Sequence, residues 1–148
     1  MKDLKDKVIV ITGGATGIGF ALAKNFGSQG AKIVIGEPRE EKLEEAFKSL
    51  SDLGIKANYT ILDVTDLKSV ENFAKFSCDC YGHVDILINN AGISAGQGQI
   101  YKANIEDARK VFDVNFFGVW HGCAVFSKIM ISQGNKAAIY NLGSENSL

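Results

Sequence analysis

Short apolar runs alternate along the chain with longer segments in which apolar residues recur every three or four positions. The apolar runs predict five strands, at 7–12, 31–36, 56–62, 84–90 and 137–143. The segments between them predict helices, at 17–29, 39–53 and 66–80. Strands that alternate with helices pair in parallel, and strands that are apolar throughout are covered on both faces. The pattern therefore predicts an α/β fold of three layers, in which helices flank a doubly wound parallel sheet.

Two further features concern the helices. Thr65 precedes the third predicted helix and is its expected N-cap. The segment 104–133 starts polar and is then apolar on almost every side between residues 111 and 131. Its large apolar side chains cannot all face one sheet: they are Phe112, Phe116, Phe117, Val119, Trp120, Val125, Phe126, Ile129 and Met130. One face is expected to pack on the sheet, and the other to form an interface or to cause aggregation.

Length, charge and composition narrow the possible functions. A chain of 148 residues is about one domain, and a net charge of −1 argues against a nucleic-acid partner bound through a basic face. We expect no membrane partner, because no apolar stretch approaches the length of a span. We expect a cytoplasmic protein, because the start "MKDLKDK" has no apolar signal core behind it.

The cysteines do not indicate a metal site. Three cysteines are an odd number and are expected to be reduced thiols. Cys78 and Cys80 form a C-x-C pair with no second pair of ligands, so a zinc site is not expected. Packing explains His121 and Cys123 better than metal binding, because both lie in the apolar segment.

The stretch "TGGATGIG" (12–19) lies between the first predicted strand and the first predicted helix. Gly13 would allow the sharp turn, Gly17 the close approach of a pyrophosphate, and Gly19 tight packing of the helix on the sheet. The helix N-terminus would offer unpaired N–H groups to a phosphate. The spacing is G-x-x-x-G-x-G rather than the commoner G-x-G-x-x-G, and any tight turn uses glycine. Its place after the first strand nevertheless favours a Rossmann-like dinucleotide-binding domain.

Glu37 follows the second predicted strand, at about the distance from the glycine turn that dinucleotide-binding domains show. Its carboxylate could accept hydrogen bonds from the adenosine ribose and repel a 2′-phosphate. The alternative is a solvated surface glutamate, one of several in "EPREEKLEE". Arg39 argues the other way, because it could reach a 2′-phosphate. We expect NAD as the cofactor, with NADP less favoured.

Five motifs in order resemble the short-chain dehydrogenase/reductase family. They are "TGGATGIG" (12–19), "LDV" (62–64), "NNAG" (89–92), "VNFFG" (114–118) and "IYNLGS" (139–144). The resemblance implies cofactor contacts from Gly13, Thr16, Gly17, Ile18, Gly19, Glu37, Asp63, Val64, Asn89, Ala91 and Gly92. It implies Asn115 and Ser144 as catalytic residues, and a second subunit packed on 111–131 in a homo-oligomer.

Each motif also has a structural explanation. Asp63 could cap the following helix, and Asn89 and Asn90 could satisfy loop backbone groups. Asn115 could be a satisfied core asparagine, and Ser144 a serine without a role in the site. The five motifs are specific only together and in this order.

The resemblance implies hydride transfer between a nicotinamide and a small alcohol or carbonyl substrate. In the family, the tyrosine of a Y-x-x-x-K motif is the acid/base, the serine orients the substrate oxygen, and the asparagine helps to hold a water that relays protons. None of the four tyrosines here has a lysine four positions later; they are Tyr59, Tyr81, Tyr101 and Tyr140. We therefore expect residues 1–148 to be a dinucleotide-binding domain that is incomplete at its C-terminus and poorly active alone. The alternative is a dinucleotide-binding module without catalysis.

Overall fold

The computed structural model describes residues 3–94 and 99–144. Its sheet consists of parallel strands in the order β3-β2-β1-β4-β5. The strands are β1 (Val8–Thr12), β2 (Lys32–Glu37), β3 (Ala57–Ile61), β4 (Ile86–Asn89) and β5 (Ala138–Asn141). The predicted five-stranded, doubly wound parallel sheet is confirmed. Strand β2 has the predicted length but begins one residue later, and the other four strands are shorter than their apolar runs.

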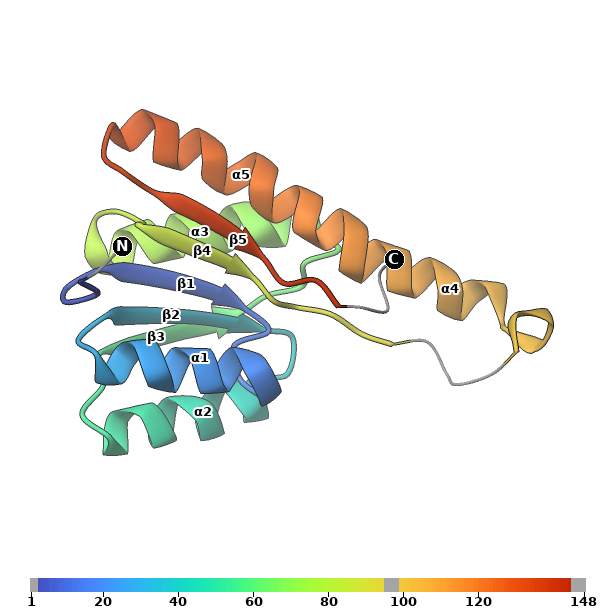
Figure 1. The fold of residues 1–148 in the computed structure, drawn as a ribbon, viewed down its shortest axis with the longest axis horizontal. Helices are drawn as coiled ribbons and strands as arrows, with labels where there is room; N and C mark the ends of the chain where they lie inside the picture. Colours follow the sequence, from blue (N-terminus) through green and yellow to red (C-terminus); the bar gives the residue numbers. More distant parts are fainter. Residues whose placement is uncertain (1–2, 95–98, 145–148) are drawn as a thin grey trace.

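Helices cover both faces of the sheet (Figure 1). The helices α1 (Gly17–Ser28) and α2 (Glu40–Asp52) lie on one face, and α3 (Leu67–Tyr81) and α5 (Gly118–Gln133) lie on the other. Successive side chains of β1 point to opposite faces of the sheet, so this strand contributes to the hydrophobic core on each face. Ile9 and Ile11 pack in the α1–α2 core, whereas Val8 and Val10 pack in the α3–α5 core. The layers are those that the apolar pattern predicts.

Helix α3 is capped by Asp66, so the expectation of a Thr65 cap is wrong. The Asp66 carboxylate accepts a hydrogen bond from the Lys68 N–H at 2.9 Å. Thr65 lies one residue before the N-cap position, because α3 begins at Leu67. Its hydroxyl instead donates to Asp63 Oδ1 at 2.7 Å in the preceding turn.

The segment after η1 (Ile100–Lys102) forms one long helix of three parts, which are α4 (Ile105–Phe112), the π-helical turn η2 (Asp113–Phe117) and α5. Figure 1 shows α4 projecting beyond the carboxyl ends of the strands. The side of α5 that faces the molecule carries Gly118, Gly122, Phe126 and Met130, all buried. Phe126 packs edge-on against Phe73 of α3.

The opposite side of this long helix is exposed. Phe112 and Trp120 are each 64% exposed, and Phe116 lies against both Phe117 and Trp120. These four residues are called the aromatic face below. The large apolar side chains of 111–131 are thus divided between a buried and an exposed side of the helix, which confirms the expectation that they cannot all face the sheet. Phe126 and Met130 lie on the inner side.

The expectation that no segment reaches the length of a membrane span is wrong. The helix Ile105–Gln133 is long and apolar enough by length and composition. One such helix is weak support for a membrane span, because core helices of folded domains can pass the same test. Here the inner side of α5 packs on α3 and β4.

Candidate functional site

The carboxyl ends of β1 and β4 meet at the centre of the sheet, where the strand order reverses direction. Ligands bind at this switch point in open parallel sheets. Thr12 joins the two strand ends, because its hydroxyl oxygen accepts hydrogen bonds from the N–H groups of Asn90 and Ala91, each at 3.0 Å. A cleft of about 510 Å³ opens beside them.

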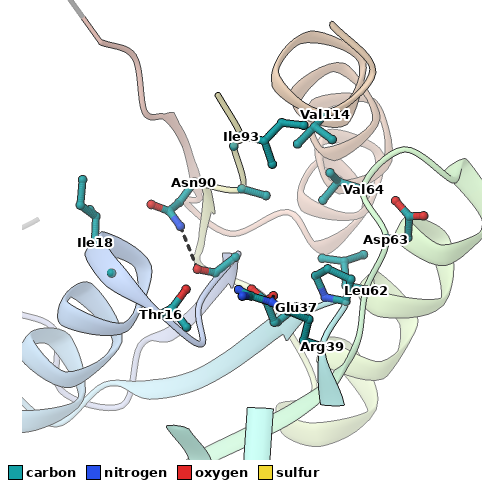
Figure 2. Close-up of a pocket in the computed structure, with 15 residues that line it drawn as sticks. Thr16, Ile18, Glu37, Arg39, Leu62, Asp63, Val64, Asn90, Ile93 and Val114 are labelled. Carbon is teal, nitrogen blue, oxygen red and sulfur yellow. Dashed lines mark hydrogen bonds and ion pairs between the residues drawn. The ribbon is translucent and has the colours of Figure 1, made fainter. Parts of the chain in front are cut away.

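The cleft is lined by segments that follow successive strands. Figure 2 shows Thr16 and Ile18 on one side and Leu62, Asp63 and Val64 on the other, with Glu37 and Arg39 between them. Most of the predicted cofactor residues belong to this lining: Gly13, Thr16, Gly17, Ile18, Glu37, Asp63, Val64, Ala91 and Gly92. The structure thus gathers predicted residues from four separate sequence segments into one cavity. Gly19 and Asn89 lie outside the lining.

Of the three glycines predicted to shape the turn, two are packed and one is open. Gly13 has a φ of 63°, and its ideal Cβ would lie 2.9 Å from the Ala91 Cα. A Cβ on Gly19 would overlap the Gly13 carbonyl oxygen. Gly17 has a φ of 53°, but a Cβ there would meet open space. Packing explains Gly13 and Gly19, whereas Gly17 leaves room in the cleft beside the turn.

The N-terminus of α1 is open to an anion. Thr16 is the N-cap, but its side chain makes no capping hydrogen bond. No acidic residue lies in the first turn of this twelve-residue helix. Since the first N–H groups of a helix have no intrahelical partner, they and the helix dipole favour a negatively charged group at this point.

Glu37 and Arg39 form an ion pair inside the cleft. Arg39 Nε donates to Glu37 Oε1 at 2.6 Å. The Glu37 side chain is 5% exposed and that of Arg39 is 54% exposed. The hydrogen bond and the charge of Glu37 raise the pKa of Arg39 above its usual value. Glu37 is therefore not the solvated surface glutamate of the alternative interpretation.

Asp63 and Val64 form the far wall of the cleft. Asp63 Oδ1 accepts hydrogen bonds from the Thr65 N–H and hydroxyl. The Val64 carbonyl oxygen lies 2.8 Å from His121 Nδ1, which must donate because a carbonyl only accepts. A Cβ on Gly118 would lie 2.6 Å from Val64 Cγ2. The long helix therefore fixes this wall through His121 and Gly118.

Asn90, rather than Asn89, lies at the cleft. Asn90 Nδ2 donates to the carbonyl oxygens of Thr12 at 2.9 Å and Gly13 at 3.0 Å, and so braces the glycine turn (Figure 2). Asn89 points to the α5 side, where its Nδ2 donates to Asn141 Oδ1 at 2.8 Å. The structural explanation for these asparagines, that they satisfy backbone groups, holds for Asn90.

Asn115 lies in the π-helical turn and holds the loop after β4. Its Oδ1 accepts from the Ile93 N–H and its Nδ2 donates to the Ile93 carbonyl, both at 2.8 Å. Ile93 and the neighbouring Val114 line the cleft. Asn115 is exposed, so it is not a buried core asparagine. π-Helical turns are frequent at functional sites, where they reposition side chains.

Ser144 and Tyr140 lie at and beyond the edge strand. Ser144 is exposed, follows β5, and is not part of the cleft lining. Ile139 packs with the α3–α5 core, so alternation points Tyr140 to the opposite face, where it is 54% exposed. Ser144 therefore lies apart from the cleft lining, beyond the carboxyl end of the edge strand β5.

Cys78 and Cys80 show no sign of activation as nucleophiles. Partial burial and the charge of Asp79 raise the pKa of the Cys78 and Cys80 thiols. Within residues 3–94 and 99–144, no group of three histidine, cysteine or acidic side chains is arranged to hold a metal.

The sequence alone did not single out several residues of the lining. They are Pro38, Leu62, Asn90, Ile93 and Val114. Asn90 had a usable signal, because it follows the last residue of β4 and so faces opposite to Asn89. Ile93 had none. Val114 was marked only as the first residue of "VNFFG", and its place at the cleft depends on where the long helix crosses the sheet.

Residues 7–148 match the family described as short chain dehydrogenase. The chain belongs to this family. Among its curated relatives, C alpha-dehydrogenase of Sphingobium sp. (strain NBRC 103272 / SYK-6) is 37% identical over 144 residues, which are 97% of this chain and 47% of the relative. The chain spans about half the length of the curated relatives that it matches.

Solved short-chain dehydrogenase structures have the same fold. A short-chain dehydrogenase/reductase of Burkholderia phymatum, in complex with NAD, is 35% identical with a TM-score of 0.92, over 97% of this chain and 51% of that one. A metagenomic short-chain oxidoreductase in complex with NADP is 28% identical with a TM-score of 0.87, over 95% of this chain and 63% of that one. The Rossmann-like fold is confirmed, and the family includes binders of either cofactor.

Proposed function

We propose that the cleft binds NAD and that this chain supplies the cofactor half of an oxidoreductase that acts on a small alcohol or carbonyl compound. The observation that carries the proposal is the glycine turn. Gly17 leaves open space at a helix N-terminus that has no side-chain cap and no acid in its first turn. A pyrophosphate fits there, because the N–H groups and the dipole favour negative charge.

The rest of the lining also fits a dinucleotide. The Glu37 carboxylate can accept hydrogen bonds from ribose hydroxyls. Leu62 and Val64 offer an apolar wall to a flat ring, with Asp63 beside them. Asn90 and Asn115 hold the glycine turn and the loop after β4 in place without occupying the cavity themselves.

NAD, when bound, supplies the carbon that accepts or donates the hydride. In this proposal Ser144 orients the substrate oxygen, and Asn115 holds the backbone of Ile93 at the edge of the cleft. Neither residue provides the acid/base that hydride transfer to or from an alcohol requires. No Y-x-x-x-K is present among residues 1–148. The second candidate function is a dinucleotide-binding module without catalysis.

NAD is proposed over NADP because Glu37, nearly buried at the end of β2, would face a 2′-phosphate. Association of two copies through the aromatic face is proposed because its four large side chains are exposed and Phe116 contacts both Phe117 and Trp120.

Calorimetric titration of the chain with NAD tests cofactor binding, and an NADH absorbance assay with a panel of alcohols tests turnover. We expect binding with little or no turnover, since general acid–base catalysis contributes about 10²–10⁴-fold. Mass spectrometry of the intact protein confirms that the assayed chain consists of residues 1–148. Absence of binding contradicts the proposal. Robust NADH production supports the oxidoreductase but contradicts the poor activity expected of the chain alone, and Tyr140 is then the first residue to substitute.

A further inference from the structure

The far wall of the cleft is held by one side chain of the long helix. His121 Nδ1 donates to the Val64 carbonyl oxygen at 2.8 Å. Val64 is buried and lines the cleft, whereas His121 is half-buried and lies one helical turn after Gly118. A Cβ on Gly118 would lie 2.6 Å from Val64 Cγ2, so the absence of a side chain there permits the close approach of α5. This approach brings the ring of His121 within hydrogen-bonding distance of the wall.

The hydrogen bond from His121 fixes more than the Val64 carbonyl. That oxygen belongs to the same planar peptide group as the Thr65 N–H. The Thr65 N–H in turn donates to Asp63 Oδ1 at 2.9 Å. One rigid peptide group is thus held on opposite sides, by His121 at its oxygen and by Asp63 at its N–H. A rotation of this peptide group would therefore disturb the orientation of the Asp63 carboxylate.

The other hydrogen bonds of residues 63–65 are local. The Asp63 N–H donates to Ser69 Oγ at 3.0 Å, and the Asp63 carbonyl oxygen accepts from the Asp66 N–H at 3.2 Å. The Thr65 hydroxyl donates to Asp63 Oδ1 as well. Among the residues that the structure describes, His121 is therefore the one distant hydrogen-bond partner of this turn.

The turn adjoins the residue proposed to hold the adenosine ribose. The Leu62 N–H donates to the Glu37 carbonyl oxygen at 3.1 Å, and Figure 2 shows Asp63 and Val64 on the same wall as Leu62. A base attached to a ribose at Glu37 would therefore meet this wall. Asp63 Oδ2 accepts no hydrogen bond from the part of the chain that the structure describes. This oxygen can accept one from the amino group of an adenine base.

We propose that His121 is a positioning residue, which orients the Asp63 carboxylate for the amino group of adenine by holding the peptide group between Val64 and Thr65. The proposal rests on the proposed binding of a nicotinamide dinucleotide in this cleft and deepens it. His121 acts through the main chain and does not itself contact the ligand. Without its N–H donor the peptide group is free to turn, and the cleft then distinguishes adenine less well from a base that lacks the amino group.

The test compares NAD with nicotinamide hypoxanthine dinucleotide, which carries an oxygen in place of the adenine amino group. Calorimetry gives both dissociation constants for the parent chain, which is expected to prefer NAD, and for each variant. His121→Leu has a carbon in place of the donor and is expected to reduce this preference by about five- to tenfold. His121→Asn is expected to restore it to within about twofold, because its Nδ2 donor occupies the same place along the side chain as Nδ1 of histidine.

Further variants separate positioning from general stability. Asp63→Ala sets the preference expected without the carboxylate, and adding His121→Leu to it is expected to change the preference no further. His83→Asn alters the other histidine of the chain, which pairs with Asp85 at 2.9 Å at the opposite end of the sheet, and is expected to leave the preference unchanged. His121→Ala replaces His121→Leu if the latter does not fold.

The inference is overturned if the parent binds both dinucleotides equally, or if loss of the His121 ring leaves the ratio of the two dissociation constants within about twofold of the parent. Failure of His121→Asn to restore a lowered ratio overturns it as well. So does nitrogen NMR that finds the proton of the neutral His121 ring on Nε2, since Nδ1 then has nothing to donate. Binding of NAD with any of these results refutes this inference alone. Absence of binding of both dinucleotides refutes the proposed function and the inference together.

Discussion

Gly13, Gly17 and Gly19 of the turn after β1 differ in what requires a glycine at each position. Gly13 and Gly19 are fixed by packing, since a side chain at either position would press on neighbouring backbone. Gly17 has free space around it and a positive φ, so packing leaves room there that a pyrophosphate would fill. The distinction predicts different consequences for substitutions that look alike in sequence.

Gly17→Val is expected to abolish dinucleotide binding while the fold survives, because the side chain would occupy the space proposed for the pyrophosphate. Backbone strain at positive φ costs about 1–2 kcal/mol. Gly54→Val is the matched control, because Gly54 has a φ of 71° and open space but lies after α2, outside the cleft. Calorimetry and urea unfolding of both variants check this. Equal NAD affinity for Gly17→Val and the control contradicts the phosphate role of Gly17.

A second prediction concerns Asp85, which lies just before β4, at the end of the sheet opposite to the cleft. Burial acts to raise its pKa, but hydrogen bonds from the Val8 N–H and the Lys7 ammonium, with the charges of His83 and Lys7, lower the pKa below its ordinary value. A carboxylate whose folded pKa is lowered stabilises the fold above its unfolded pKa of about 3.9. This contribution is lost as the pH falls through the folded pKa.

Asp85→Asn is therefore expected to lower the free energy of unfolding by about 1–3 kcal/mol at pH 7. The difference from the parent chain should shrink below about pH 3.9, as the parent carboxylate becomes protonated. Urea unfolding at pH 7 and at successively lower pH values measures it. A difference that stays constant over this range would show that the charge of Asp85 contributes no stability.

At the scale of elements, α5 is held close to the sheet by small residues on its inner side. A Cβ on Gly122 would overlap Asn89 Oδ1, and one on Gly118 would press on Val64. The same close approach brings His121 to the Val64 carbonyl, at the far wall of the cleft. The position of α5 therefore couples the packing of β4 to the shape of the site.

Gly122→Ala is expected to push α5 away from β4 and to lower the free energy of unfolding by about 1–3 kcal/mol, the usual effect of overpacking. Gly143→Ala, which would meet open space after β5, is the control and should have little effect. Thermal unfolding of both variants checks the comparison. Equal stability of Gly122→Ala and the parent would mean that α5 is free to shift.

At the scale of the whole molecule, the aromatic face is the main exposed apolar surface of the long helix. Trp120 and Phe112 are each 64% exposed, whereas Phe126 is fully buried against α3. A charge at Phe126 would therefore disrupt the fold rather than test association. Trp120 is the suitable position, because its side chain points away from the core.

Trp120→Glu is expected to convert a dimer, or an aggregating chain, into a monomer, because a charge in an apolar interface is costly to desolvate. Leu53→Glu adds the same charge at a residue that is 57% exposed at the end of α2, and should leave the association unchanged. Light scattering over a range of concentrations measures both. A parent chain that is monomeric at high concentration, with no change on either substitution, contradicts association through the aromatic face.

The sequence by itself determined the elements, the parallel doubly wound sheet and most of the cleft. Apolar runs can only be buried strands when amphipathic segments separate them, and strands so connected pair in parallel, which brings their carboxyl ends together. Glycine at 13, 17 and 19 and glutamate at 37 therefore had to meet at one edge, and Gly13, Gly17 and Glu37 line one cavity there. Thr16, Asp63 and Val64 line the same cavity, and they were predicted from the resemblance that the ordered motifs carry.

Only the tertiary structure decided which of several similar side chains faces the cleft. Strand alternation directs Asn90 to the glycine turn and Asn89 to α5, and the packing of α5 turns Phe126 inward and Trp120 outward. The Glu37–Arg39 pair likewise depends on the path of the chain between β2 and α2. The surroundings of each side chain depend on its direction relative to the elements packed against it. Those elements are distant in sequence, so the local pattern of apolar and polar residues does not identify them.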